Sequence, residues 1–65
     1  MTDKKTKILI IDDVQENIYL LQEMLDQKEF KTITANSGKE GIRLALNENP
    51  GLIICDIIKP GFDNM

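Results

Sequence analysis

The chain contains no histidine and no tryptophan, and Cys55 is the single cysteine among its 65 residues. Without histidine, the chain cannot supply imidazole for acid–base catalysis, and it has no Cys/His cluster for zinc. One cysteine cannot form a disulfide bond within the chain. No apolar run approaches the roughly 18 residues of a membrane-spanning helix, and no apolar segment of signal length follows the amino terminus. We therefore expect a cytoplasmic protein that contacts no membrane.

Basic residues are also in the minority, with 8 Lys and Arg against 11 Asp and Glu and a net charge of −3. A nucleic-acid surface would need a basic patch or stripe, whereas Lys4, Lys5 and Lys7 form the only cluster and precede the first apolar run. We interpret residues 1–6 as a solvated leader and expect no nucleic-acid binding through this segment. Hydrophobic residues make up 42% of the chain, which is enough for one small folded domain.

Two short apolar runs each end in aspartate. Residues 8–11 precede Asp12 and Asp13, and residues 52–55 precede Asp56. Such runs are typical of strands that are covered on both faces of a parallel sheet. Residues 31–35 alternate between polar and apolar side chains, which predicts an edge strand with a partly wet face.

An amphipathic helix is predicted over residues 15–28. Its apolar face follows the i, i+4, i+7 and i+11 spacing, and two further apolar residues widen this face. The predicted inward residues are Val14, Ile18, Leu21 and Leu25, with Leu20 and Met24 beside them.

A second helix is predicted to begin after Ser37 and to run to about Asn47. Ser37 and Glu40 have the spacing of a capping box. We expect Ile42, Ala45 and Leu46 to point inward, and residues 49–51, Asn-Pro-Gly, to end the helix. Gly41 lies inside this helix and should cost about 1 kcal/mol relative to alanine.

The predicted element order is therefore strand, helix, strand, helix, strand, which implies an α/β fold with a parallel sheet and right-handed crossovers. Because ligands gather at the carboxyl ends of parallel strands, Asp12, Asp13 and Asp56 are expected to meet at one edge. Three close carboxylates stay ionised only beside a compensating cation, and oxygen ligands with open water positions suit Mg²⁺. Each aspartate could instead cap the following helix or occupy a turn.

The chain resembles the receiver domains of two-component response regulators. The likeness covers nearly all of the chain, and its motifs are specific in combination rather than singly. The matching stretches are Lys-Ile-Leu-Ile-Ile-Asp-Asp at residues 7–13, Thr-Ala-Asn-Ser-Gly-Lys-Glu-Gly at residues 34–41, and the run from Pro50 to Asp63.

This resemblance implies a function and a site. Asp56 matches the aspartate that accepts a phosphoryl group from the phosphohistidine of a histidine kinase or phosphotransfer protein. Asp12 and Asp13 match the acidic pair that holds Mg²⁺, and Ile58 matches the residue whose backbone carbonyl usually joins the metal ligands. The implied protein is a signalling module and not an enzyme with ordinary turnover.

The resemblance also implies a truncated, flavodoxin-like βαβαβ fold with strand order 2-1-3, since the family's domain is considerably longer than residues 1–65. The family's phosphate-binding Lys and switch Thr or Ser match no position of this chain. The third strand would then be an uncovered apolar edge, which favours pairing with another chain. We expect a homodimer in which the third strands pair antiparallel or elements are exchanged.

Three other functions can be weighed against this one. A structural or dimerisation fragment that is no longer phosphorylated is the alternative that the missing Lys and Thr favour. A nucleotide- or flavin-binding enzyme is disfavoured, because the loop after the first strand, residues 12–15, contains no glycine. A haloacid-dehalogenase-type phosphatase would need Asp-x-Asp there, which the adjacent Asp12 and Asp13 do not provide.

Overall fold

The five elements follow one another in the predicted order. The computed structural model describes residues 6–56, which form β1 (Lys7–Asp12), α1 (Gln15–Asp26), β2 (Lys31–Ala35), α2 (Gly38–Glu48) and β3 (Leu52–Asp56). The first five residues of the expected leader and all residues after Asp56 lie outside this range. No helix within it is both long and apolar enough to cross a membrane.

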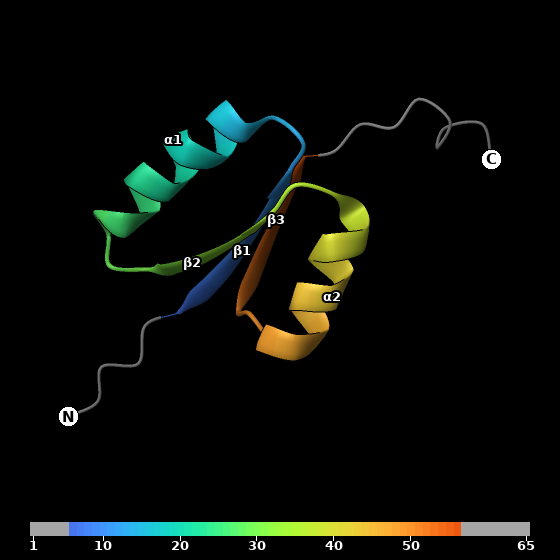
Figure 1. Cartoon of the computed structure of the whole chain (residues 1–65). Helices are drawn as coiled ribbons and strands as arrows, with labels where there is room; N and C mark the ends of the chain where they lie inside the picture. Colours follow the sequence, from blue (N-terminus) through green and yellow to red (C-terminus); the bar gives the residue numbers. More distant parts are fainter. Residues whose placement is uncertain (1–5, 57–65) are drawn as a thin grey trace.

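The three strands form one parallel sheet in the order β2-β1-β3, which confirms the predicted fold class. Parallel neighbours require crossover connections, and Figure 1 shows α1 and α2 covering opposite faces of the sheet. Ile8 of β1 lies between Thr32 and Leu52, and Asp12 is the register partner of Asp56. The register therefore brings the acidic ends of β1 and β3 to the same edge.

The core is built around β1, whose apolar side chains are nearly inaccessible to solvent. Alternate residues of a strand point to opposite faces, so Ile8 and Ile10 pack beneath α1 while Leu9 and Ile11 pack beneath α2. The α1 side is completed by Ile18, Leu21, Leu25, Phe30 and Ile54, and the α2 side by Ile33, Ala35, Leu44 and Ala45.

The apolar face of α1 is narrower than the sequence pattern predicts. Ile18 is buried, as expected, but Val14 precedes the helix with extended backbone and is 46% exposed. Leu20 and Met24, which were expected to widen the buried face, are also exposed. They lie on the side of α1 that faces β3, and no element of residues 6–56 covers that side.

The start of α2 confirms the predicted cap, since the Ser37 hydroxyl accepts a hydrogen bond from the backbone N–H of Glu40 at 3.2 Å. The Glu40 carboxylate pairs with Arg43 instead of closing the capping box. The expected inward face is partly wrong, because Ile42 and Leu46 are exposed while Ala45 packs on the sheet, as expected, together with Leu44.

Gly41 explains why α2 turns Leu44 and Ala45, rather than Ile42 and Leu46, toward the sheet. It is buried against β1, and a Cβ atom built at this position would lie 2.8 Å from Cγ1 of Ile11. The missing side chain therefore lets the helix backbone approach the strand closely, which offsets the low helix propensity of glycine. The face centred on Gly41 is the one that meets the sheet, so Ile42 and Leu46 turn away from it.

The end of α2 also follows the prediction. Asn49 adopts the left-handed conformation, with φ of 54° and ψ of 57°, and its backbone N–H donates to the carbonyl of Ala45. Asparagine tolerates this conformation better than most residues, and the chain then turns through Pro50 and Gly51 into β3.

Candidate functional site

Two of the predicted site residues lie side by side at the carboxyl edge of the sheet. Asp12 ends β1, Asp56 ends β3, and the two are register partners on neighbouring strands. Adjacent strands lie about 4.8 Å apart, and both carboxylates project to the face that carries α1. They line one end of a groove of about 500 Å³ between α1 and β3. The sequence-based prediction of a carboxylate cluster is thus met for this pair.

Asp12 is the buried member of the pair, with 2% of its surface exposed. Its Oδ1 accepts a hydrogen bond from the Val14 backbone N–H at 2.9 Å, and its Oδ2 accepts one from Nδ2 of Asn17 at 3.2 Å. Buried polar groups need such partners. These bonds fix the loop between β1 and α1, so Asp12 has the turn role considered for it, whereas its side chain does not cap α1.

Asp56 is the exposed member of the pair. Within residues 6–56, no donor forms a hydrogen bond with its carboxylate. The two neighbouring carboxylates therefore differ in environment: that of Asp12 is buried and hydrogen-bonded, and that of Asp56 is exposed to solvent.

The structure does not bring three carboxylates together. Asp13 is exposed and does not line the groove. In the part of the chain that the structure describes, no group of three or more acidic, histidine or cysteine residues is placed to hold a metal ion. The expected backbone ligand, Ile58, lies outside that part.

The sequence pattern did not identify Asn17 as a site residue. Asn17 is exposed, but its amide donates a hydrogen bond to Asp12 and lines the groove. Its position in the first turn of α1, five residues after Asp12, is the signal that could have identified it. The remaining wall of the groove is apolar and consists of Leu20, Leu21, Met24 and Ile54.

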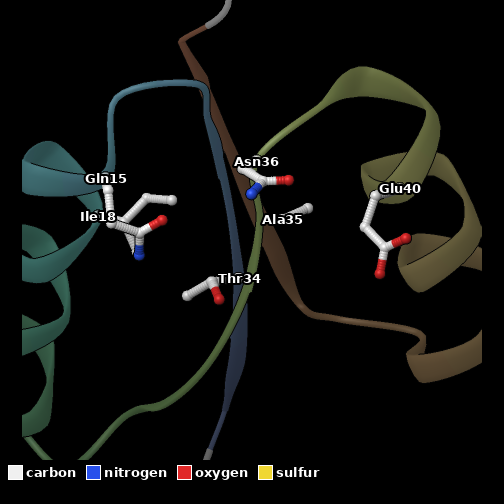
Figure 2. Close-up of a pocket in the computed structure, with 6 residues that line it drawn as sticks. All are labelled: Gln15, Ile18, Thr34, Ala35, Asn36 and Glu40. Atoms are coloured by element: carbon white, nitrogen blue, oxygen red, sulfur yellow. The ribbon is translucent and has the colours of Figure 1, made fainter.

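A second hollow, of about 220 Å³, lies at the carboxyl end of β2 between the first turns of α1 and α2, and neither Asp12 nor Asp56 lines it. Figure 2 shows its lining, with Gln15 and Ile18 from α1, residues 34–36 at the end of β2, and Glu40 from α2. The pKa of Glu40 lies below its ordinary value because Arg43 donates hydrogen bonds to its carboxylate. All buried side-chain polar atoms of residues 6–56 have hydrogen-bond partners.

Comparison with known proteins gives the family. Residues 8–63 match the family described as the response regulator receiver domain. The alkaline phosphatase synthesis transcriptional regulatory protein PhoP of Bacillus subtilis is 37% identical over 91% of this chain and 25% of its own length. Protein PilH of Pseudomonas aeruginosa is 35% identical over 88% of this chain and 47% of its own length.

A third relative is the sporulation initiation phosphotransferase F of Bacillus subtilis, which is 32% identical over 91% of this chain and 48% of its own length. The chain thus spans less than half the length of each of these relatives. No solved structure matches it significantly. The family match covers the sheet, both helices and the paired carboxylates of Asp12 and Asp56, and the chain belongs to the response regulator receiver domain family.

Proposed function

We propose that the chain is a phospho-acceptor module of a two-component phosphorelay and that Asp56 receives the phosphoryl group. The observation that carries the proposal is the pairing of an exposed carboxylate, Asp56, with a buried, hydrogen-bonded one, Asp12, at neighbouring strand ends. A donor can reach the first carboxylate, while the second has a fixed orientation beside it. The family membership supports this role.

The donor in this proposal is the phosphohistidine of a histidine kinase or of a phosphotransfer protein. An oxygen of the Asp56 carboxylate attacks phosphorus, an O–P bond forms and the N–P bond of the donor breaks. The electron pair stays on the released imidazole, which takes a proton from water. The product is an acyl phosphate on Asp56, so the chain takes up one group per event rather than turning over substrate as an enzyme. We place this reaction in the cytoplasm, with no role for nucleic acid or membrane in this segment.

We further propose that Mg²⁺ is the cofactor of this site. Asp12 and Asp56 would hold it, with Asp13 and the backbone carbonyl of Ile58 as further ligands. The donor chemistry of the described pair fits, because Mg²⁺ is commonly bound by one or two carboxylates plus waters and phosphate oxygens. Each carboxylate oxygen of Asp12 accepts one hydrogen bond and keeps a second acceptor position. When bound, the ion neutralises negative charge on the phosphoryl oxygens.

The test is the intact mass of the purified chain after incubation with Mg²⁺ and a small-molecule phosphodonor. We expect a gain of one phosphoryl group that chelation of Mg²⁺ with EDTA abolishes. Asp56→Asn should lose the gain, whereas Asp26→Asn, which removes an exposed carboxylate at the far end of α1, should keep it. A gain that survives in Asp56→Asn would contradict the proposal, as would the absence of any gain in the unmodified chain.

A second candidate function is a structural fragment that associates with itself. The observation in its favour is the exposure of β3, whose Leu52 and Ile53 are 52% and 48% exposed although both are large apolar residues. We propose that the chain forms a homodimer through this strand. Self-association and phosphoryl acceptance are compatible, so the mass measurement decides only whether the chain also carries the chemistry.

A further inference from the structure

Hydrogen bonds, rather than the side chain's own torsional preference, set the plane of the Asp12 carboxylate. The last torsion of an aspartate side chain is broad and roughly two-fold, unlike the staggered torsions of aliphatic side chains. Each oxygen of Asp12 has one donor, with the Val14 backbone N–H on Oδ1 at 2.9 Å and Nδ2 of Asn17 on Oδ2 at 3.2 Å. Donors on both oxygens define the plane, whereas a single donor would leave rotation about Cβ–Cγ to be limited by packing alone.

Asn17 is itself held in a rigid part of the chain. Its backbone N–H donates to the carbonyl of Val14 at 3.1 Å, and the next residue, Ile18, is buried in the core. Since Val14 also donates to Asp12, the three residues close a ring of hydrogen bonds. Groups carried by a packed helix are placed more precisely than groups on a loop. In this ring the Asn17 amide is the one side-chain donor, so a substitution can remove it and leave the backbone bonds in place.

The amide of Asn17 suits a site that must attract a cation. Asn17 lines the same groove as Asp12 and Asp56, and an ionised carboxylate can only accept hydrogen bonds. A lysine or arginine at position 17 could also donate to Asp12, but its positive charge would offset the negative charge that attracts a divalent ion. The neutral amide orients the carboxylate and leaves its charge available.

We propose that Asn17 is a positioning residue of the acceptor site, which holds the Asp12 carboxylate in the orientation that binds Mg²⁺. Asn17 acts through Asp12 and touches neither the ion nor the phosphoryl group. This role rests on the proposed function, in which Asp12 and Asp56 hold Mg²⁺. It is independent of what covers the apolar part of the groove, because the bonds that carry it lie within residues 12–17.

Binding of Mg²⁺ alone, followed by the backbone amide NMR signals of residues 12–17, tests this role. Asn17→Leu keeps a side chain of similar size and branching, favours the helix and removes the donor. We expect its dissociation constant for Mg²⁺ to rise by about tenfold or more, as for other hydrogen-bond partners of metal ligands. Gln15→Leu is the matched control, since it removes an exposed carboxamide from the same turn, outside the groove. Unchanged affinity in Asn17→Leu, or an equal loss in Gln15→Leu, would overturn the proposal.

A second control separates positioning from the general stability of α1. Gln22→Leu also removes a carboxamide donor from this helix, one that binds Oγ1 of Thr32 in β2 at 3.2 Å. This variant should unfold more readily and keep its affinity for Mg²⁺, with circular dichroism confirming that each variant is folded. If Gln22→Leu lost as much affinity as Asn17→Leu, the role of Asn17 would be structural and the proposal wrong.

The Mg²⁺ dependence of phosphorylation by a small-molecule phosphodonor provides the closing test. In Asn17→Leu the half-saturating Mg²⁺ concentration should rise by the same factor as the dissociation constant, while the rate at saturating Mg²⁺ stays within about twofold. A lower saturated rate with unchanged half-saturation would mean that Asn17 acts on the phosphoryl group instead. If the unmodified chain bound Mg²⁺ but gained no phosphoryl group, the proposed function would fail and the binding comparison would still decide the role of Asn17. Absence of Mg²⁺ binding by the unmodified chain would reject that role, and the mass measurement would still decide the proposed function.

Discussion

β1 and β3 have nearly the same composition and opposite environments. Residues 8–11 read Ile-Leu-Ile-Ile and residues 52–55 read Leu-Ile-Ile-Cys, and each strand ends in aspartate. The apolar residues of β1 are at most 7% exposed, whereas Leu52 is 52% exposed and Ile53 48%. The difference lies in position within the described residues 6–56, where β1 lies between two strands and between two helices, while β3 has a neighbouring strand on one side alone.

The contrast extends to the aspartates that end the two strands. Asp12 is buried and accepts two hydrogen bonds, and Asp56 is exposed. The same residue type at equivalent strand positions therefore fixes a loop in one case and exposes its carboxylate to solvent in the other. At the central strand the aspartate side chain is held in one orientation, and at β3 the aspartate side chain is accessible from solvent.

The largest effect is expected from a matched pair of substitutions, one in β1 and one in β3, that compares how much each strand contributes to the free energy of unfolding. Leu9→Ala removes a fully buried side chain and should lower the free energy of unfolding by about 2–5 kcal/mol. Leu52→Ala removes a half-exposed side chain and should cost less than about 1 kcal/mol in dilute solution. Urea denaturation, with sucrose added if Leu9→Ala is unfolded in buffer, provides the comparison.

Repeating the two denaturation measurements at several protein concentrations extends this comparison. If β3 pairs with a second copy, the cost of Leu52→Ala should grow with protein concentration, since association stabilises the folded state by mass action. The cost of Leu9→Ala should change much less. If the two variants lost the same free energy of unfolding at all concentrations, the proposed difference between β1 and β3 would be wrong.

The aspartates should give the next largest effect. Asp12→Ala leaves the Val14 N–H and the Asn17 amide without their acceptor and should cost about 1–3 kcal/mol. Asp56→Ala removes an exposed carboxylate and should change the free energy of unfolding by no more than about 0.5 kcal/mol. Thermal unfolding followed by circular dichroism measures both, and an equal loss for Asp56→Ala would mean that its carboxylate is structural.

The packing of α2 on β1 predicts a smaller effect. Gly41→Ala would push a methyl group into Ile11 and should destabilise the fold by about 1 kcal/mol after the gain in helix propensity. Gly38→Ala has open space around its Cβ and should be neutral or slightly stabilising. Ile11→Val should recover part of the loss in the double variant. Urea denaturation measures all three, and a Gly41→Ala chain as stable as Gly38→Ala would show that the close approach is unimportant.

The smallest effect concerns pH and the exposed face of α2. The Glu40–Arg43 pair lowers the pKa of Glu40, so its stabilising contribution is complete above the unfolded-state pKa. The contribution is lost as the pH falls through the lower, folded-state pKa. Glu40→Gln should therefore slightly destabilise the chain at neutral pH and have less effect in acid. A carboxyl titration by NMR should show the pKa of Glu40 rising in Arg43→Gln.

Much of the fold could be predicted from sequence because its signals are local. The apolar runs located β1 and β3, the Ser37–Glu40 spacing located the start of α2, and residues 49–51 located its end. The approach of Asp12 to Asp56 was also predictable, since parallel strands bring their carboxyl ends to one edge.

The errors come from contacts that periodicity does not encode. A helical repeat gives an apolar stripe but not the part of it that meets the sheet, so Leu20, Met24, Ile42 and Leu46 were expected inside and are exposed. In α2 the face that meets the sheet is determined by the close packing of Gly41 on Ile11, which is possible because glycine has no Cβ atom. The bond from Asn17 to Asp12 depends on the geometry of the loop between them.

The most direct test of the central claim is to locate the phosphoryl group chemically. After treatment with Mg²⁺ and a phosphodonor, borohydride reduces an acyl phosphate and leaves homoserine in place of the aspartate that carried it. Peptide mass spectrometry should then find homoserine at position 56 and aspartate unchanged at positions 12 and 13. Homoserine at either of those positions, or none in a chain that had gained a phosphoryl group, would contradict the assignment of Asp56 as the acceptor.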